Sequence, residues 1–300
     1  MYIKNTNLGG VSLAFNKIAV GVAFSPTSEA MLAETLRLAK LFNSEVLLIH
    51  VGARTAEVEQ RMNSMIQKCE ALRDRVSVVW GSGDPVNVIL DSCKKHHVDL
   101  LVTGALKKEN LVQFYVGSIA RKVLRKARCS VLTIINPSIE NIPYKNIVVS
   151  AEDSPFITDA IATACAMTPN DNSSWVHVVK EVKLYGLSMA AADQHTEEEY
   201  DDVRQGLVKQ EIENVKEMMQ RIPHEGLRVN IKTVSGKSGF ALTEFAQSKN
   251  AELLVIGAQP RKFSFLDRLF PHDMEYILAD LPCSLLVVQP SKYRKEAGRG

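Results

Sequence analysis

The sequence predicts an α/β protein made of two tandem five-stranded domains, each with a doubly wound parallel sheet. Three observations lead to this prediction. Segments of continuous apolar character alternate with segments of helical periodicity, which is typical of parallel strands covered by helices on both faces. The same ordered set of segments occurs twice along the chain. The length of 300 residues is about twice that of a typical domain.

The first strand of each half runs into a Ser-Pro pair. IAVGVAF at 18–24 precedes Ser25, and IVVSA at 147–151 precedes Ser154. Each Ser is expected to cap a helix that has Pro at its first position. The helix after Ser25 places a set of mostly apolar side chains on one face, which we expect to be buried: Met31, Thr35, Leu38 and Phe42.

A second strand follows in each half, EVLLIHV and SWVHVV, with His50 and His177 in matching positions. We expect these histidines to pack near the strand ends or to bond the backbone rather than to catalyse. A striped helix comes next in each half, and its apolar side chains are expected to face the core: Val58, Met62, Met65, Cys69 and Leu72 in the first, and Val208, Ile212, Val215, Met219 and Ile222 in the second.

The remaining strands also come in pairs. The third strands are 76–80 and 229–234, the fourth are 99–104 and 252–257, and the fifth are 129–135 and 283–288. Each fourth strand ends in glycine, at Gly104 and Gly257. Each half is therefore a complete α/β unit.

The boundary between the units is expected in the Pro- and Asn-containing stretch at 136–145. The first domain then covers 1–140 and the second covers 141–300. The second is longer because an insert at about 180–206 separates its second strand from its striped helix. The acidic run at 197–202 within this insert is expected to be a solvated loop or the first turn of a helix.

The composition excludes several classes of protein. With 46% hydrophobic and 23% charged residues, the chain is neither disordered nor fibrous. A net charge of +2 is too balanced to hold a nucleic-acid backbone, so no nucleic-acid partner is expected. No uncharged run approaches the roughly twenty residues of a membrane-spanning helix, and the start MYIKNTNLGG lacks the apolar core of a signal peptide. We therefore expect no membrane association and a cytoplasmic location.

The loops after the first and fourth strands are the candidate ligand site, since ligands of open parallel sheets bind beyond the carboxyl ends of the strands. In the first half the fourth strand ends at Gly104, and Gly117 and Ser118 open the next helix. Glycine lets a ligand approach the backbone closely, and a helix N-terminus favours anions. The pattern predicts a phosphate site; a glycine turn and a Ser cap that bind nothing are the alternative.

With these segments in place, the chain resembles two fused universal stress protein domains. The resemblance covers about 17–289 and rests on the strand order and on segments such as GSGDP at 81–85 and GSIARKVLRKARCSVLTI at 117–134. It implies an adenine nucleotide alpha hydrolase-like fold. In nucleotide-binding members it also implies an Asp just after strand one and a GxxGx9G[S/T] loop after strand four.

Carried onto the first half, the resemblance gives a set of candidate nucleotide-binding residues: Ala23, Ser25, Val51, Gly104, Lys107, Gly117 and Ser118. Two of them depart from the family pattern. Ala23 stands at the position of the Asp, and Lys107 stands where the middle glycine is usual. The lysine could neutralise a phosphate or could occupy the space that a phosphate needs.

The second half departs further from the family pattern. Glu152 stands at the Asp position and Gly257 is kept, but Pro260 replaces the middle glycine and Pro271-His272 replaces Gly and Ser. Proline has no N–H to offer a phosphate, so we expect no phosphate cradle there.

Several other patterns are weaker. Ser235-Gly236-Lys237-Ser238 resembles the end of a Walker A loop, but Ile231 stands where the first glycine is required. A basic stretch on the helix after Gly117 is expected to be its solvated side: Arg121, Lys122, Arg125, Lys126 and Arg128. The five cysteines lack metal-ligand spacing and are expected to be reduced thiols, mostly in the core: Cys69, Cys93, Cys129, Cys165 and Cys283.

Three functions stay open. The first is a stress-response protein whose N-terminal half binds ATP or another adenine nucleotide, with Mg²⁺ as the accompanying ion. The second is a scaffold that binds no nucleotide and acts through an unidentified protein partner. The third is a slow ATPase, for which the sequence offers no general base; catalytic and metal-ligating residues are not assigned.

The resemblance also implies that the two halves pair through their fifth strands. We expect Val131–Ile135 to meet Leu285–Val288, which makes an intramolecular pseudo-dimer and hides two apolar edges. Further pairing into a homodimer stays open.

Overall fold

The computed structural model describes residues 15–107, 113–152, 157–182, 197–236, 239–258 and 272–290. Ten strands form one continuous sheet in the order β10-β9-β8-β11-β12-β7-β4-β1-β2-β3. The first half contributes β1 (Lys17–Gly21), β2 (Glu45–Val51), β3 (Val76–Gly81), β4 (Leu100–Gly104) and β7 (Ser130–Ile134). The second contributes β8 (Asn146–Ser150), β9 (Trp175–Val182), β10 (Arg228–Ser235), β11 (Leu253–Gly257) and β12 (Ser284–Val288). Each half is parallel and has the same strand order, so the predicted repeat is confirmed.

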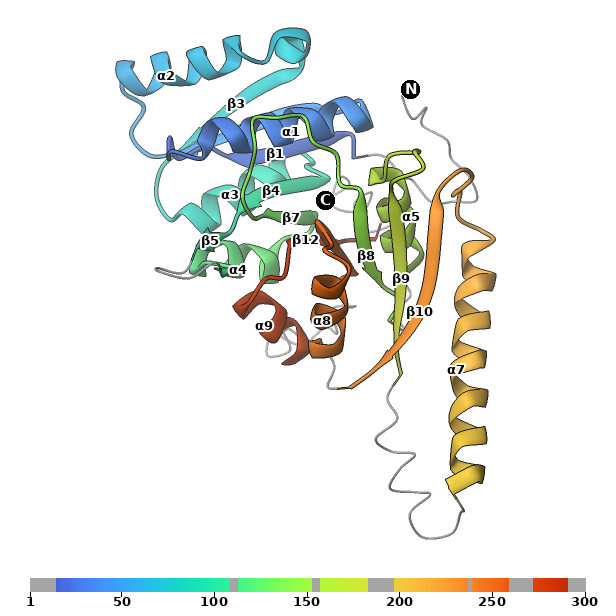
Figure 1. Ribbon diagram of the computed structural model, residues 1–300. Coiled ribbons are helices and arrows are strands. Elements are labelled where there is room, and N and C mark those ends of the chain that lie inside the picture. Colours follow the sequence, from blue (N-terminus) through green and yellow to red (C-terminus); the bar gives the residue numbers. More distant parts are fainter. Residues whose placement is uncertain are drawn as a thin grey trace.

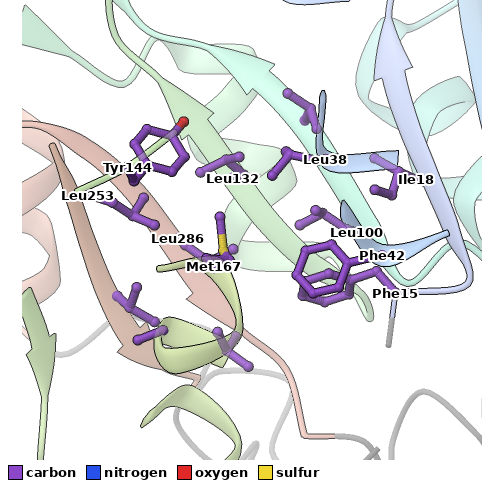
Figure 2. Close-up of a cluster of buried hydrophobic side chains, with 14 of the residues drawn as sticks. Phe15, Ile18, Leu38, Phe42, Leu100, Leu132, Tyr144, Met167, Leu253 and Leu286 are labelled. Atoms are coloured by element: carbon purple, nitrogen blue, oxygen red, sulfur yellow. The ribbon is translucent and has the colours of Figure 1, made fainter. Parts of the chain in front are cut away.

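Helices cover both faces of the sheet (Figure 1). Buried side chains of α1 (Ser28–Phe42), α2 (Ala56–Gln67), α5 (Ile157–Met167) and α7 (Glu197–Met219) join one core cluster. Those of α3 (Pro85–Lys95), α4 (Ser118–Lys126), α8 (Phe240–Ser248) and α9 (His272–Ala279) join the other. Each cluster contains residues of both halves, and Figure 2 shows the first. Within the described ranges, no helix has the length and apolar character needed to cross a membrane.

The two halves meet where the sequence predicts. Strands β7 and β12 pair antiparallel, with Leu132 opposite Leu286. Ser130 and Ser284, the first residues of β7 and β12, make equivalent hydrogen bonds across the junction. The Oγ of Ser284 accepts from the N–H of Ile135 at 3.3 Å, and the Oγ of Ser130 accepts from the N–H of Gln289 at 3.0 Å. The junction therefore pairs β7 and β12, each of which would otherwise be the exposed edge strand of its own half.

A second contact between the halves corrects one prediction. The basic stretch of α4 is not only a solvated face, since Arg121 and Arg125 both donate to the carboxylate of Glu275 on α9. The guanidinium of Arg121 lies 2.5 Å from Oε2 of Glu275. These arginines therefore join the two halves on the α4 and α9 face of the sheet.

The predicted core faces are largely confirmed. Met31, Thr35, Leu38 and Phe42 are all buried, as are the five cysteines, which are free thiols. The stripe of the first half extends from α2 into a short 3-10 helix at Glu70–Arg75. In the second half the stripe is buried only toward the end of α7, at Val215 and Met219, and just after it, at Ile222.

Two local predictions are wrong, and a third is not tested. Helix α1 begins at Ser28 rather than after Ser25. The insert is shorter than 180–206, because β9 continues to Val182 and α7 already begins at Glu197, within the acidic run. The second Ser-Pro pair, at 154–155, lies outside the described residues.

The matching of His50 with His177 is also wrong. Ile18 pairs with Val46 in the first half, and its equivalent Ile147 pairs with Val176 in the second. This register makes Lys180 the equivalent of His50. It places His177 at the position of Leu47, which is buried on the face of the sheet opposite to that of His50.

Candidate functional site

The predicted site lies at the carboxyl ends of β1 and β4 in the first half. Strand β4 ends at Gly104, and the chain then forms a small antiparallel hairpin of β5 (Leu106–Lys107) and β6 (Phe114–Tyr115). Helix α4 begins after it at Ser118, and its N-cap residue Gly117 has no side chain to cap it. The first turn of α4 has backbone N–H groups to which an anion can bind.

Gly117 is in close contact with the hairpin. A Cβ atom added to Gly117 would lie 2.7 Å from Cδ1 and 3.2 Å from Cγ of Leu106. The first distance is shorter than real Cβ contacts, so the Leu106 side chain would have to shift. The backbone of Gly117 is extended, with φ −64° and ψ 165°, a conformation open to any residue. A side chain at this position would therefore be opposed by Leu106, which would have to move, and not by the backbone conformation.

Lys107 lies on the other face of the hairpin. Successive side chains of a strand point to opposite faces, whereas directly paired residues share a face. Leu106 pairs with Tyr115 and Lys107 pairs with Phe114, so Lys107 is directed away from the face that Leu106 presents to Gly117. The tip of the hairpin at 108–112 lies outside the described residues.

The hairpin is bonded to the second half of the protein. The carbonyl of Phe114 accepts from the N–H of Leu281 at 2.9 Å, and the N–H of Val116 donates to the carbonyl of Leu278 at 3.0 Å. The loop predicted to hold phosphate is thus also part of the contact between the halves.

The end of β1 carries the candidates Ala23 and Ser25. Ala23 is exposed and follows Val22, whose N–H still bonds the carbonyl of Ile49 at 2.8 Å. Ser25 caps nothing: its Oγ lies 3.2 Å from the hydroxyls of Thr27 and Ser28. The carbonyl of Ser25 accepts from the N–H of Ser28 at 3.0 Å, so a turn precedes the helix.

Between Ala23 and Ser25, Phe24 has a left-handed backbone with φ 52°, which is rare for a bulky residue. The ring centroid of Phe24 lies 5.2 Å from the ring centroid of His50. The guanidinium carbon of Arg61 lies 4.6 Å from the centroid of the Phe24 ring. Arg61 also donates to the carbonyl of Phe24 at 3.3 Å. The ring and backbone of Phe24 are thus held by one arginine.

The candidate Val51 ends β2 beside this cluster. His50 is buried, with its Nδ1 2.9 Å from the carbonyl of Val22, and its ring meets Trp80 edge-on at 5.4 Å. The sequence analysis singled out His50 but missed Phe24 and Trp80. Their positions could have identified them, since all three residues stand near the carboxyl ends of adjacent parallel strands.

The second half has different chemistry at its corresponding edge. Glu152 occupies the position of Ala23, because the N–H of Ala151 bonds the carbonyl of Val179 at 2.7 Å just as Val22 bonds Ile49. Lys180, the equivalent of His50, is buried, and its ammonium lies 3.4 Å from the carboxylate of Glu211.

The expected loss of a phosphate loop from the second half involves residues outside the described ranges, Pro260 and Pro271. The turn at Gly236 leads to α8 through Gly239, whose N–H is bonded by the carboxylate of Glu181 at 3.1 Å. Ser235 and Gly236 thus belong to a strand end and turn, while Lys237 and Ser238 lie outside the described ranges.

The sequence pattern of the universal stress protein family matches the chain twice, over residues 52–134 and 143–289. The chain belongs to the universal stress protein family. The second match spans all five strands of the second half, and the first spans β3, β4 and β7 of the first half. The two halves of the sheet are therefore built from the same family unit, repeated within a single chain.

Individual members of the family show the same relationship. A universal stress protein of Methanocaldococcus jannaschii is 28% identical over 158 residues, which cover 46% of this chain and 93% of that protein. A universal stress protein E homolog of Haemophilus influenzae is 23% identical over 222 residues, which cover 72% of this chain and 69% of that protein.

Solved structures share the fold over nearly the whole chain. A functionally unknown protein of Pseudomonas aeruginosa superposes with a TM-score of 0.68 and 16% identity, covering 96% of this chain and 97% of that one. A universal stress protein of Archaeoglobus fulgidus superposes with a TM-score of 0.63 and 15% identity, covering 93% of this chain and 97% of that one. The tandem arrangement is therefore shared with solved proteins.

Proposed function

We propose that this universal stress protein is a stress-response protein whose first half binds ATP or another adenine nucleotide, accompanied by Mg²⁺. The ligand would lie beyond the carboxyl ends of β1 and β4. The residues proposed to contact it follow the family pattern: Ala23, Ser25, Val51, Gly104, Gly117 and Ser118. Lys107 is left out of this set because the hairpin register directs it away from Gly117.

The observation that carries the proposal is the start of α4. Gly117 and Ser118 open the nine-residue helix α4, which follows the hairpin after Gly104, and the N-cap residue Gly117 has no side chain to cap it. Free N–H groups at a helix N-terminus, reached through glycine, suit a phosphate group. The Ser118 side chain is exposed and adds a hydroxyl.

The second half is proposed not to bind nucleotide. At the carboxyl edge of β9, Lys180 and Glu211 form a partly buried ion pair. The half is proposed instead to serve as the fixed partner of the first, through the β7–β12 junction and through Glu275. A domain boundary near 140 and a cytoplasmic location belong to the same proposal.

A scaffold that binds no nucleotide is the second candidate function. It is favoured by Ala23, which offers no carboxylate, and by the contact of Leu106 with Gly117. Losing a hydrogen bond to a buried ligand group costs about 1–3 kcal/mol, so ATP affinity would fall roughly five- to 150-fold.

The test compares two glycine variants of the full chain after removal of bound nucleotide. Gly117→Val adds a branched side chain over the first turn of α4 and is expected to abolish ATP binding. The chain should still fold, since the backbone of Gly117 suits any residue and the opposing Leu106 is 51% exposed and free to move. The matched control is Gly206→Ala, because no atom lies within 4 Å of a Cβ at that position on α7. Equal ATP affinity in both variants would reject the site.

A further inference from the structure

Leu106 lies beside Gly117 at the start of α4. Its Cδ1 would be 2.7 Å from a Cβ on Gly117, so its side chain covers the glycine whose small size would let a ligand approach. We propose that Leu106 is a plug of the nucleotide site, and that the site opens only when this side chain moves away. This inference rests on the proposed function.

The hairpin, and not burial in a packed core, positions the Leu106 side chain against Gly117. Leu106 is 51% exposed, although its Cδ1 would lie 2.7 Å from a Cβ placed on Gly117. Its pairing with Tyr115 puts it on the face of the hairpin nearest Gly117, while Lys107 points to the face of Phe114. Leu106 therefore obstructs the phosphate end of the site, and Lys107 does not.

The plug can open without unfolding its surroundings. Strand β6 is held in place by the second half, through the bonds of Phe114 with Leu281 and of Val116 with Leu278. Strand β5 has only two residues, and the exposed half of the Leu106 side chain meets no protein. Opening therefore requires a rotation of Leu106, or a local separation of β5 from β6, while α4 stays fixed.

The expected gain from removing the plug follows from its burial. When Leu106 moves aside, the apolar surface that is now covered, about half of a leucine side chain, becomes exposed to water, and this costs free energy. A variant without the leucine side chain avoids that cost, so it should bind the ligand about three- to tenfold more tightly. The gain should appear for ATP and ADP but not for adenosine, because the plug covers the phosphate end of the site.

The experiment measures ATP, ADP and adenosine binding by isothermal titration with Leu106→Ala, Leu106→Phe and the unmodified protein. Leu106→Ala should tighten ATP and ADP three- to tenfold, as estimated above, and Leu106→Phe should weaken them. Ile139→Ala is the matched control, since it removes an apolar side chain that is 75% exposed and far along the chain from the site. Lys107→Ala should change ATP binding less than Leu106→Ala does.

The outcomes separate this inference from the function on which it rests. If the unmodified protein binds ATP and Leu106→Ala binds it no more tightly, the plug is refuted and the nucleotide site stands. If the unmodified protein binds no ATP but Leu106→Ala does, the plug is confirmed as a closed gate. If neither binds ATP at millimolar concentration, the proposed function itself is refuted.

Discussion

Leu132 and Leu286 are the most informative place to perturb the junction of the halves. They are equivalent residues of β7 and β12, they pair directly with each other, and both are fully buried in one core cluster. Replacing either by Ala should lower the free energy of unfolding by about 2–5 kcal/mol, from lost apolar burial and the cavity left behind. Because they are in direct contact, the double variant should differ from the sum of the two single effects by about 0.5–3 kcal/mol.

The assay is urea unfolding of the full chain, followed by circular dichroism. We expect one transition, because the sheet and both core clusters run through both halves. The control is Leu254→Ala, which removes the same group from β11 on the opposite face of the sheet. Leu132→Ala and Leu254→Ala should be additive within about 0.5 kcal/mol. Additivity of Leu132→Ala with Leu286→Ala would refute the β7–β12 junction.

Two further predictions concern the site and the second half. Ala23→Asp restores the carboxylate that the family pattern places after strand one, and should raise ATP affinity roughly five- to 150-fold; a titration that shows no gain would mean that no ligand group reaches this position. Burial, with a smaller effect of the charge of Lys249, lowers the pKa of His177, so stability should fall as the pH drops below about 6.5, where only the unfolded chain binds the proton readily. His177→Leu, which copies the equivalent Leu47, should lose less stability between about pH 7.5 and pH 5.5 in urea unfolding; an equal loss would assign this pH dependence to other groups.

The residues alone predicted the repeat and its parallel sheets, and the resemblance to the universal stress protein family predicted the junction. Continuous apolar strands bounded by turn residues identify a parallel sheet, and an apolar fifth strand at an edge needs a partner. The same reasoning placed Gly104 and Gly117 at the ends of their elements, because glycine is common in the turns that join strands to helices.

Details that depend on contacts between distant segments could not be predicted. Ser25, Thr27 and Ser28 all stand near the start of α1, and the turn closed by the carbonyl of Ser25 decides that the helix begins at Ser28. His177 looked equivalent to His50 because short apolar strands can be aligned in more than one register. Leu106 occupies a variable position of the family pattern, so only the fold of the hairpin reveals its contact with Gly117.

The most direct test of the proposed function is the number of nucleotides that one chain binds. Purified protein freed of nucleotide would be titrated with ATP and Mg²⁺ in an isothermal calorimeter, up to millimolar concentration. One site per chain is expected, in the first half, because the second half carries the Lys180–Glu211 ion pair at its corresponding edge. Two sites would contradict the assignment of the second half, and no binding in either the unmodified protein or Leu106→Ala would leave a scaffold that acts through its protein partners.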